Sequence, residues 1–312
     1  MATAVSVQHL QKRYGPTVAA ADVSFDVSDG EIFGLLGPNG SGKTTTVECL
    51  QGLRHADEGR LEVFGLDPRT DPAGVRRLVG SQLQDSALPD RLRVGEALRL
   101  FSTIRPGGRP WEAALEEWGL GDQRRTAFGD LSGGQRQRLF VALALVADPR
   151  LVILDEMTTG LDPAGRRVAW DLVEAVRDRG ATVLLVTHFM DEAQRLCDRL
   201  AVLVGGGVVA TGTPAEVVAS QCRSVVVTFT VAPGSDLGFL RSVAGVDAVE
   251  QDGGGRARVT GAGPLLARVG HALVCHGLEP IDLRGELPTL EDAYLALTAG
   301  DPASPGQEEA GA

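Results

Sequence analysis

Residues 37–45 place the tightest constraint on what this chain can fold into. They read Gly37-Pro38-Asn39-Gly40-Ser41-Gly42-Lys43-Thr44-Thr45 and match the phosphate-binding pattern G-x-x-x-x-G-K-[ST] without a gap. Because glycine has no Cβ, such a loop can turn successive backbone N–H groups toward a phosphate chain. A helix beginning near Lys43 would add its unpaired N–H groups and its dipole. The pattern predicts that Lys43 reaches the β- and γ-phosphates and that Thr44 binds magnesium.

A glycine-rich turn without a ligand is the alternative interpretation, because the chain contains 40 glycines in 312 residues. The lysine weighs against it, since Lys12 and Lys43 are the only two lysines in the sequence. The flanking residues also favour the phosphate site. Residues 32–36 read as a short buried strand and residues 44–53 as a helix, which is the strand, loop and helix order that the pattern requires.

The composition indicates a folded, acidic chain with 43% hydrophobic residues and a net charge of −11. This charge disfavours a sequence-independent grip on nucleic acid, and we expect no nucleic-acid partner. No apolar run is long enough to cross a bilayer, and the N-terminus lacks a signal-peptide pattern. The cysteines are far apart, which favours reduced thiols in a cytosolic protein over a zinc site or a disulfide frame. They are Cys49, Cys197, Cys222 and Cys275.

Alternating apolar residues predict an antiparallel pair of strands before the phosphate loop, at residues 5–7 and 18–27. Tyr14 lies between them. Its ring could be a platform for a planar base, although a tyrosine in a turn is more often simply packed. Further strands are expected at residues 61–64 and 79–84. Gln82 and Gln84 share one face of the second, where a glutamine can orient water or contribute to a metal shell.

Ser132 precedes the last of three expected helices, which span residues 94–101, 111–118 and 133–147. With Gln135 three residues later, Ser132 fits a capping box in front of an apolar run. A plain cap does not explain Gly133 and Gly134, because each glycine destabilises a helix by about 1 kcal/mol relative to alanine. Two bare backbone positions in the first turn favour the close approach of an anion.

Two buried parallel strands are predicted to end in polar residues. Residues 151–154 are followed by Asp155 and Glu156, and residues 182–186 by Thr187 and His188. Solvated polar residues at strand ends are the alternative. The carboxyl ends of parallel strands, however, are where open α/β sheets bind ligands. Adjacent carboxylates point to opposite faces, so that one can hold magnesium while the other faces a water molecule.

The pattern changes near residue 220, after a hairpin that turns at residues 205–207 and a short helix that begins at Pro214. The following residues are expected to form a strand, a helix, two strands, a helix and a strand, with the first helix at residues 237–243. This order is typical of a ferredoxin-like domain. A last helix is expected at residues 290–297. We therefore predict a nucleotide-binding domain at residues 1–220, with a helical part at about 94–147, and a small α+β domain at 221–299. Residues 300–312 have the composition of a disordered tail.

In their order, these motifs resemble the nucleotide-binding subunits of ATP-binding cassette (ABC) transporters over residues 5–220. Residues 37–45 look like Walker A, and residues 131–135 read LSGGQ, the signature of that family. Residues 151–156 look like Walker B, residues 159–162 resemble the D-loop, and His188 resembles the switch histidine. The signature is the most specific motif, because many phosphate-loop ATPases lack it. The resemblance implies an α/β fold: a mixed-sheet P-loop ATPase core with an antiparallel β subdomain and a helical subdomain.

The resemblance also implies a role for each matching residue. Tyr14 would stack on the adenine of ATP, and Lys43 would hold its phosphates together with the rest of the loop. Glu156 would polarise the attacking water, and His188 would contact the γ-phosphate. Three residues would hold Mg²⁺: Thr44, Gln84 and Asp155. Gln84 fits the family's Q-loop glutamine better than Gln82 does.

The signature residues cannot serve their own chain's ATP in this family. Ser132, Gly133, Gly134 and Gln135, with Asp162 of the D-loop, would close over the ATP of a second copy. The resemblance thus implies a homodimer that encloses two ATP molecules. A separate transmembrane permease would be its other partner, and the chain would be cytoplasmic and peripheral on the inner face of the cell membrane.

The C-terminal residues 289–298 are similar to a bacterial subgroup that includes drug exporters of the daunorubicin-resistance type. One departure from the family is Met157, which stands where a proline usually follows the catalytic glutamate and puts the turnover rate in doubt. Two other functions stay open. One is a soluble cassette ATPase that acts on ribosomes or DNA, and the other is an ATP-dependent protein that sequesters a drug.

Overall fold

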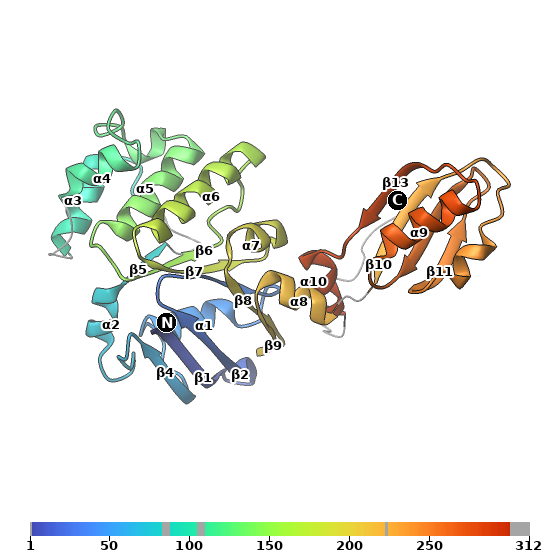
Figure 1. Ribbon diagram of the computed structural model, residues 1–312. Coiled ribbons are helices and arrows are strands. Elements are labelled where there is room, and N and C mark those ends of the chain that lie inside the picture. Colours follow the sequence, from blue (N-terminus) through green and yellow to red (C-terminus); the bar gives the residue numbers. More distant parts are fainter. Residues whose placement is uncertain (1, 83–87, 105–109, 222–223, 300–312) are drawn as a thin grey trace, which may run out of the picture. The chain divides into compact units, whose positions relative to one another are not determined.

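The computed structural model describes residues 2–82, 88–104, 110–221 and 224–299 of the chain (Figure 1). These residues form two compact units, one extending to Pro214 and the other comprising Ala215–Leu297. The sequence places the boundary slightly later, at residue 220. In the described ranges, no helix combines the length and the apolar character that a membrane span requires.

The first unit is built on a nine-stranded mixed sheet with the order β4-β1-β2-β9-β8-β3-β7-β6-β5. Its antiparallel neighbours are β1 (Thr3–Tyr14), β2 (Thr17–Ser28) and β4 (Glu58–Val63), and the hairpin β8 (Arg199–Val204) and β9 (Gly207–Gly212). Its parallel centre consists of β3 (Ile32–Leu36), β5 (Val79–Gln82), β6 (Leu151–Asp155) and β7 (Thr182–Thr187), with β8 parallel to β3. The predicted α/β class, with an antiparallel part before a buried parallel part, is confirmed.

Seven α-helices of the first unit lie in the described ranges: α1 (Lys43–Leu50), α2 (Pro72–Leu78), α3 (Val94–Ile104), α4 (Trp111–Glu117), α5 (Gly133–Leu145), α6 (Pro163–Asp178) and α7 (Met190–Leu196). Helices at the positions of α1, α3, α4 and α5 were expected above, whereas α2 and α7 were not predicted from the sequence. Each of these two has seven residues, too few for a clear helical period. A local signal does mark α2, since the Asp71 side chain caps it and Pro72 opens its first turn.

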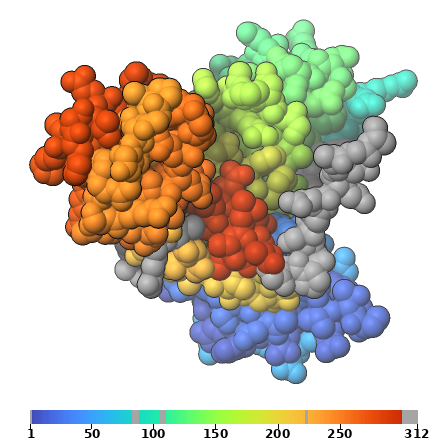
Figure 2. All heavy atoms as spheres, turned by 90° about the vertical axis from the view of Figure 1, so that its right-hand side faces the viewer, coloured from blue at the N-terminus to red at the C-terminus, as the bar shows by residue number. Residues whose placement is uncertain are grey.

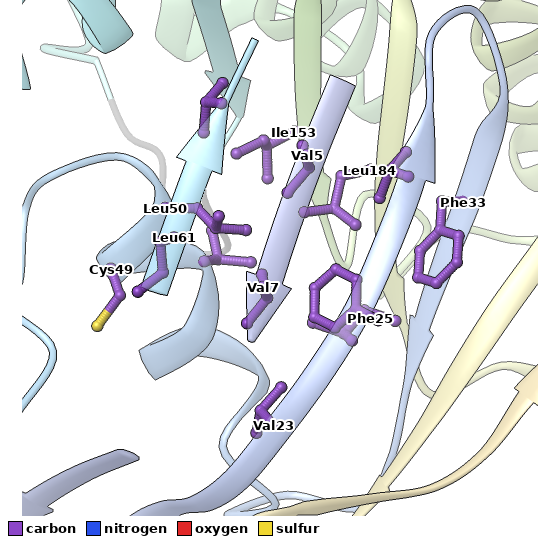
Figure 3. Close-up of a cluster of buried hydrophobic side chains, with 14 of the residues drawn as sticks. Val5, Val7, Val23, Phe25, Phe33, Cys49, Leu50, Leu61, Ile153 and Leu184 are labelled. Atoms are coloured by element: carbon purple, nitrogen blue, oxygen red, sulfur yellow. The ribbon is translucent and has the colours of Figure 1, made fainter. Parts of the chain in front are cut away.

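Helix α1 lies between the antiparallel strands and the parallel strands, and one hydrophobic cluster joins all three (Figure 3). Cys49 and Leu50 project from α1 into this cluster. The rings of Phe25 on β2 and Phe33 on β3 stack with their centroids 5.3 Å apart. This packing holds α1, the helix that follows the phosphate loop, against the strands.

The second unit has a four-stranded antiparallel sheet with the order β11-β12-β10-β13. Its elements are α8 (Pro214–Gln221), β10 (Val225–Thr230), β11 (Val246–Gln251), β12 (Arg256–Gly261), α9 (Leu265–Cys275), β13 (Ile281–Glu286) and α10 (Leu290–Thr298). Val259 and Phe229 of the sheet pack with Val269 of α9 in a core of their own. Figure 2 draws this unit in orange and red.

The helix predicted at residues 237–243 is wrong, because only a 3-10 turn, Gly238–Ser242, forms there. Asp236 accepts a hydrogen bond from the Gly238 N–H, and the Ser242 hydroxyl donates to the Phe239 carbonyl. These local bonds, and the burial of Leu240, hold a tight turn in place of a regular helix. The ferredoxin-like class of this unit stays a prediction.

Candidate functional site

The register of the parallel strands brings the polar strand ends to one edge of the sheet. Leu36, the last residue of β3, pairs with Thr187, and Asp155 pairs with Val186. Gly37, Glu156 and His188, which follow directly in the sequence, therefore begin side by side. The predicted convergence of the phosphate loop with the two polar strand ends is seen in the structure.

The phosphate loop is shaped so that its backbone, not its side chains, lines the helix start. Gly42 precedes α1 with a left-handed φ of 100°, and no side chain caps that helix. A Cβ on Gly42 would collide with the Ala19 carbonyl oxygen, so this position requires glycine. The unpaired N–H groups of the first turn are available to an anion, and a phosphate is the ligand that such a terminus suits.

Lys43 is the buried cation of the site, with an exposed fraction of 6%. Its Nζ donates hydrogen bonds to the carbonyl oxygens of Gly37, at 2.7 Å, and Pro38, at 3.0 Å. Burial lowers the pKa of Lys43, and the carboxylates of Glu156 and Asp155 oppose that shift. The ammonium group therefore lies near both carboxylates, where it can balance additional negative charge.

Glu156 and His188 form a pair across the ends of β6 and β7. His188 Nδ1 lies 3.1 Å from Glu156 Oε1, and the Glu156 side chain is 7% exposed. The backbone of Glu156 has a φ of 49°, in the left-handed region that residues other than glycine seldom adopt. Hydrogen bonds from the Glu156 N–H to the Val186 carbonyl and from the Thr159 N–H to the Glu156 carbonyl hold it there. Such strain is found most often at functional sites.

Asp155 and Thr44 have oxygen atoms of the kinds that bind Mg²⁺, a carboxylate and a hydroxyl. Asp155 is 3% exposed at the end of β6, whereas Thr44 is exposed in the first turn of α1. A carboxylate and a hydroxyl beside a phosphate site are ligands that Mg²⁺ accepts, usually together with phosphate oxygens and waters. The residues present therefore fit the ion. Gln84, the third predicted ligand, lies outside the described residues. Gln82 accepts a hydrogen bond from the Gln137 side chain at 3.2 Å.

Tyr14 ends strand β1 and is 38% exposed. Lys12 Nζ lies 5.6 Å from the centroid of its ring, and Arg54 Cζ lies 5.7 Å from it. Lys12 is in turn bound to Asp57 at 2.7 Å. The ring is thus an accessible aromatic surface with two cations nearby, and an accessible ring can serve as a platform for a planar base.

The signature residues lie at the exposed start of α5. Gln135 N–H donates to Ser132 Oγ at 3.3 Å, and Ser132 N–H donates to Gln135 Oε1 at 2.9 Å, so the predicted capping box is present. The glycines need another explanation. Among the described residues, a Cβ on Gly134 would meet no atom within 4 Å, and one on Gly133 would meet only the Leu161 side chain at 4.0 Å. Contacts with these residues therefore do not require glycine at either position.

Asp162 caps helix α6, because its carboxylate accepts a hydrogen bond from the Gly165 N–H at 2.7 Å. The side chain of Met157, where a proline was expected, is 2% exposed. The residue is thus packed into the interior directly after the strained Glu156.

The comparisons with known proteins agree with this geometry. A family model described as ABC transporter matches residues 20–159. The chain is 36% identical over 307 residues to the daunorubicin resistance ATP-binding protein of Streptomyces coeruleorubidus, an alignment that covers 96% of this chain and 97% of that relative. The chain belongs to the ABC transporter family.

Two further ABC proteins are similar. Over 222 residues this cassette is 40% identical to the Nod factor export ATP-binding protein I of Burkholderia orbicola, covering 70% of this chain and 73% of the relative. A solved ATP-binding subunit of an ABC transporter matches with a TM-score of 0.62 and 29% identity, covering 69% of this chain and 92% of that one. As a member of the family, this ABC cassette binds and hydrolyses ATP.

Proposed function

We propose that this ABC cassette is the ATP-hydrolysing subunit of an exporter for a drug or another small molecule. Two similar proteins support this, because their names assign them to daunorubicin resistance and Nod factor export. The similarity to the first covers 97% of its length and so includes the second unit. The chain would work on the inner face of the membrane with a separate permease, since the described helices include no membrane span.

We assign to the site residues the roles that membership of the family implies. Tyr14 stacks on adenine, and the backbone of residues 37–45 with Lys43 binds the phosphates. Thr44, Asp155 and Gln84 would hold Mg²⁺, which would neutralise charge on the phosphate oxygens. Phosphoryl transfer depends mostly on position and charge. The buried ammonium of Lys43 is therefore expected to contribute to both binding and hydrolysis.

Glu156 accepts a hydrogen bond from the water molecule that attacks the γ-phosphate. Its contact with His188, at 3.1 Å, is the single observation that carries this proposal. A carboxylate held by a neighbouring side chain keeps the orientation that a general base needs. His188 sits where it can also donate to the γ-phosphate, so that it joins the base to the substrate.

The signature closes the site of a second copy. Ser132 and Gly134 lie on an exposed helix start, where contacts with the described residues do not require glycine. A nucleotide brought by another protomer would need that bare backbone, because a phosphate must approach the N–H groups closely. Asp162, at the start of α6, lines the same interface. Two ATP molecules in a head-to-tail homodimer satisfy both requirements.

The test is Glu156→Gln, which keeps the size of the side chain and removes its charge. We expect ATP hydrolysis to fall at least 100-fold, the Kd for ATP to change less than threefold, and an ATP-dependent dimer to accumulate in size-exclusion chromatography. Glu62→Gln is the control, because Glu62 forms an ion pair with Arg60 on the surface of β4 and has no other ion pair among the described residues. Undiminished hydrolysis in the Glu156 variant would refute the assignment of the base.

Co-purification of the tagged full-length chain tests the partner. Recovery of a polytopic membrane protein supports the exporter. Recovery of ribosomes or DNA in its place would overturn it in favour of a soluble cassette ATPase. Binding of a drug by the isolated chain, dependent on ATP and without a membrane partner, would favour sequestration.

A further inference from the structure

Glu192 is a buried carboxyl group for which the proposed mechanism gives no role. It lies in the first turn of α7 and is 1% exposed. The other buried acidic residues among those described are Asp155, a candidate metal ligand, and Glu31, which pairs with Arg199. No ion pair of Glu192 is found in the described part of the chain. A buried carboxyl without a cation must find hydrogen-bond donors or lose stability.

Three donors face this carboxyl group: the hydroxyls of Thr158 and Thr187 and the indole N–H of Trp170. Both threonines are fully buried. Neither carboxyl oxygen of Glu192 makes a hydrogen bond of good geometry here, and the same holds for the Thr158 hydroxyl and the Trp170 indole. These polar atoms have been removed from water together, so small adjustments that pair them are strongly favoured.

Two of these donors, Thr158 and Thr187, belong to the segments that carry the reacting residues, and Trp170 belongs to α6. Thr158 follows Glu156 by two residues, and Thr187 directly precedes His188. Glu156 N–H is bonded to the Val186 carbonyl, and Thr187 Oγ1 accepts a hydrogen bond from the Phe189 N–H at 3.0 Å. Glu192 thus lies near one side chain from each of the segments that carry Glu156 and His188, and it can bind both.

We propose that Glu192 is a positioning residue for ATP hydrolysis, whose carboxyl group joins Thr158 to Thr187 and so fixes the distance between Glu156 and His188. The inference rests on the proposed roles of Glu156 and His188. Burial raises the pKa of Glu192, which favours the neutral form of this carboxyl. A neutral side chain of the same shape that can both donate and accept should therefore replace it.

The experiment compares Glu192→Gln with Glu192→Met in the full-length chain, since methionine has a similar length and forms no strong hydrogen bond. We expect the Gln variant to keep at least half of the wild-type kcat. The Met variant should lose at least tenfold in kcat, while its KM for ATP changes less than threefold. Glu31→Met is the matched control. Glu31 is a buried glutamate directly before the start of β3, at the opposite end of the strand from the phosphate loop, and kcat is expected to stay unchanged in this variant.

Two results would overturn the proposal: a Met variant with wild-type kcat, or a loss of kcat that the Gln variant shares in full. If the Met variant does not fold, Thr158→Val and Thr187→Val replace it, with the same expected loss in kcat at constant KM. The Met variant combined with Thr158→Val should be no slower than the Met variant alone, and multiplied losses would contradict a shared action. Failure of the proposed function is separate, because it would show as full hydrolysis in Glu156→Gln.

Discussion

His188 Nδ1 lies 3.1 Å from Oε1 of Glu156, although 32 positions separate the two residues in the chain. The parallel pairing of β6 with β7 produces this contact, because it aligns Asp155 with Val186 and leaves both side chains at the strand ends. A carboxylate and an imidazole at this distance share a proton or a hydrogen bond, and each restricts the rotation of the other.

We expect His188→Ala to lower the kcat of ATP hydrolysis about 100-fold, which is the size of effect typical when a group that assists proton transfer is lost. The Kd for ATP should change little, because Lys43 and the loop remain. His9→Ala is the control, since His9 forms a similar pair with Asp22 at 3.0 Å on the surface of β1 and β2. Steady-state kinetics and nucleotide titration measure both quantities. Full activity in the His188 variant would exclude the pair from the reaction.

Replacing Lys43 by methionine should weaken ATP binding by at least tenfold, measured by titration with a fluorescent nucleotide. The substitution should also change how the free energy of unfolding depends on pH. Burial lowers the pKa of Lys43 below its unfolded value, so the unfolded chain binds the proton more tightly. Stability of the wild type should therefore rise, relative to the variant, as the pH increases through the folded pKa toward 10.5. A difference in Tm that does not change with pH would contradict this.

We expect Gly134→Ala to raise the stability of the protein while lowering its ATPase activity. A Cβ there meets no atom of the described residues within 4 Å, so alanine should stabilise α5 by about 0.5–1 kcal/mol. ATP hydrolysis should nevertheless fall at least tenfold, because the added methyl group lies where a nucleotide on a second copy must approach. Denaturant unfolding and ATPase assays measure the two effects. Gly270→Ala, in α9 of the second unit, is the control for hydrolysis. Unchanged hydrolysis would show that the signature backbone is not covered in the active state.

Alkylation at pH 8 should distinguish the described cysteines. Cys275 is exposed, whereas Cys49 and Cys197 are buried. Burial raises the pKa of the Cys49 thiol to about 11 and raises that of Cys197 as well. Because the thiolate is the reactive form, both should react only after unfolding. A Cys222→Ser background removes the cysteine outside the described residues. Mass spectrometry of the labelled peptides gives the result, and early labelling of Cys49 would show that the cluster around α1 opens readily.

The phosphate loop, the signature and the buried strands could be predicted from the sequence because each depends on neighbouring residues. Glycines set the path of the loop, and unbroken apolar runs set the strands. Predictions from local sequence patterns were less reliable for short helices. The helices α2 and α7 gave no clear period, and local side-chain bonds turned residues 238–242 into a 3-10 turn. Glu192 was overlooked for the same reason, since an acidic residue in a short helix resembles any surface charge.

The sequence by itself determined which residues are chemically able to bind a nucleotide, because residue type and spacing specify the loop and the acidic strand end. Only the tertiary structure decided which of them meet. Strand register set His188 beside Glu156, and tertiary packing buried Lys43 near two carboxylates and Glu192 near Thr158 and Thr187. Such contacts join residues far apart in the chain, and their energies depend on burial that no local pattern contains.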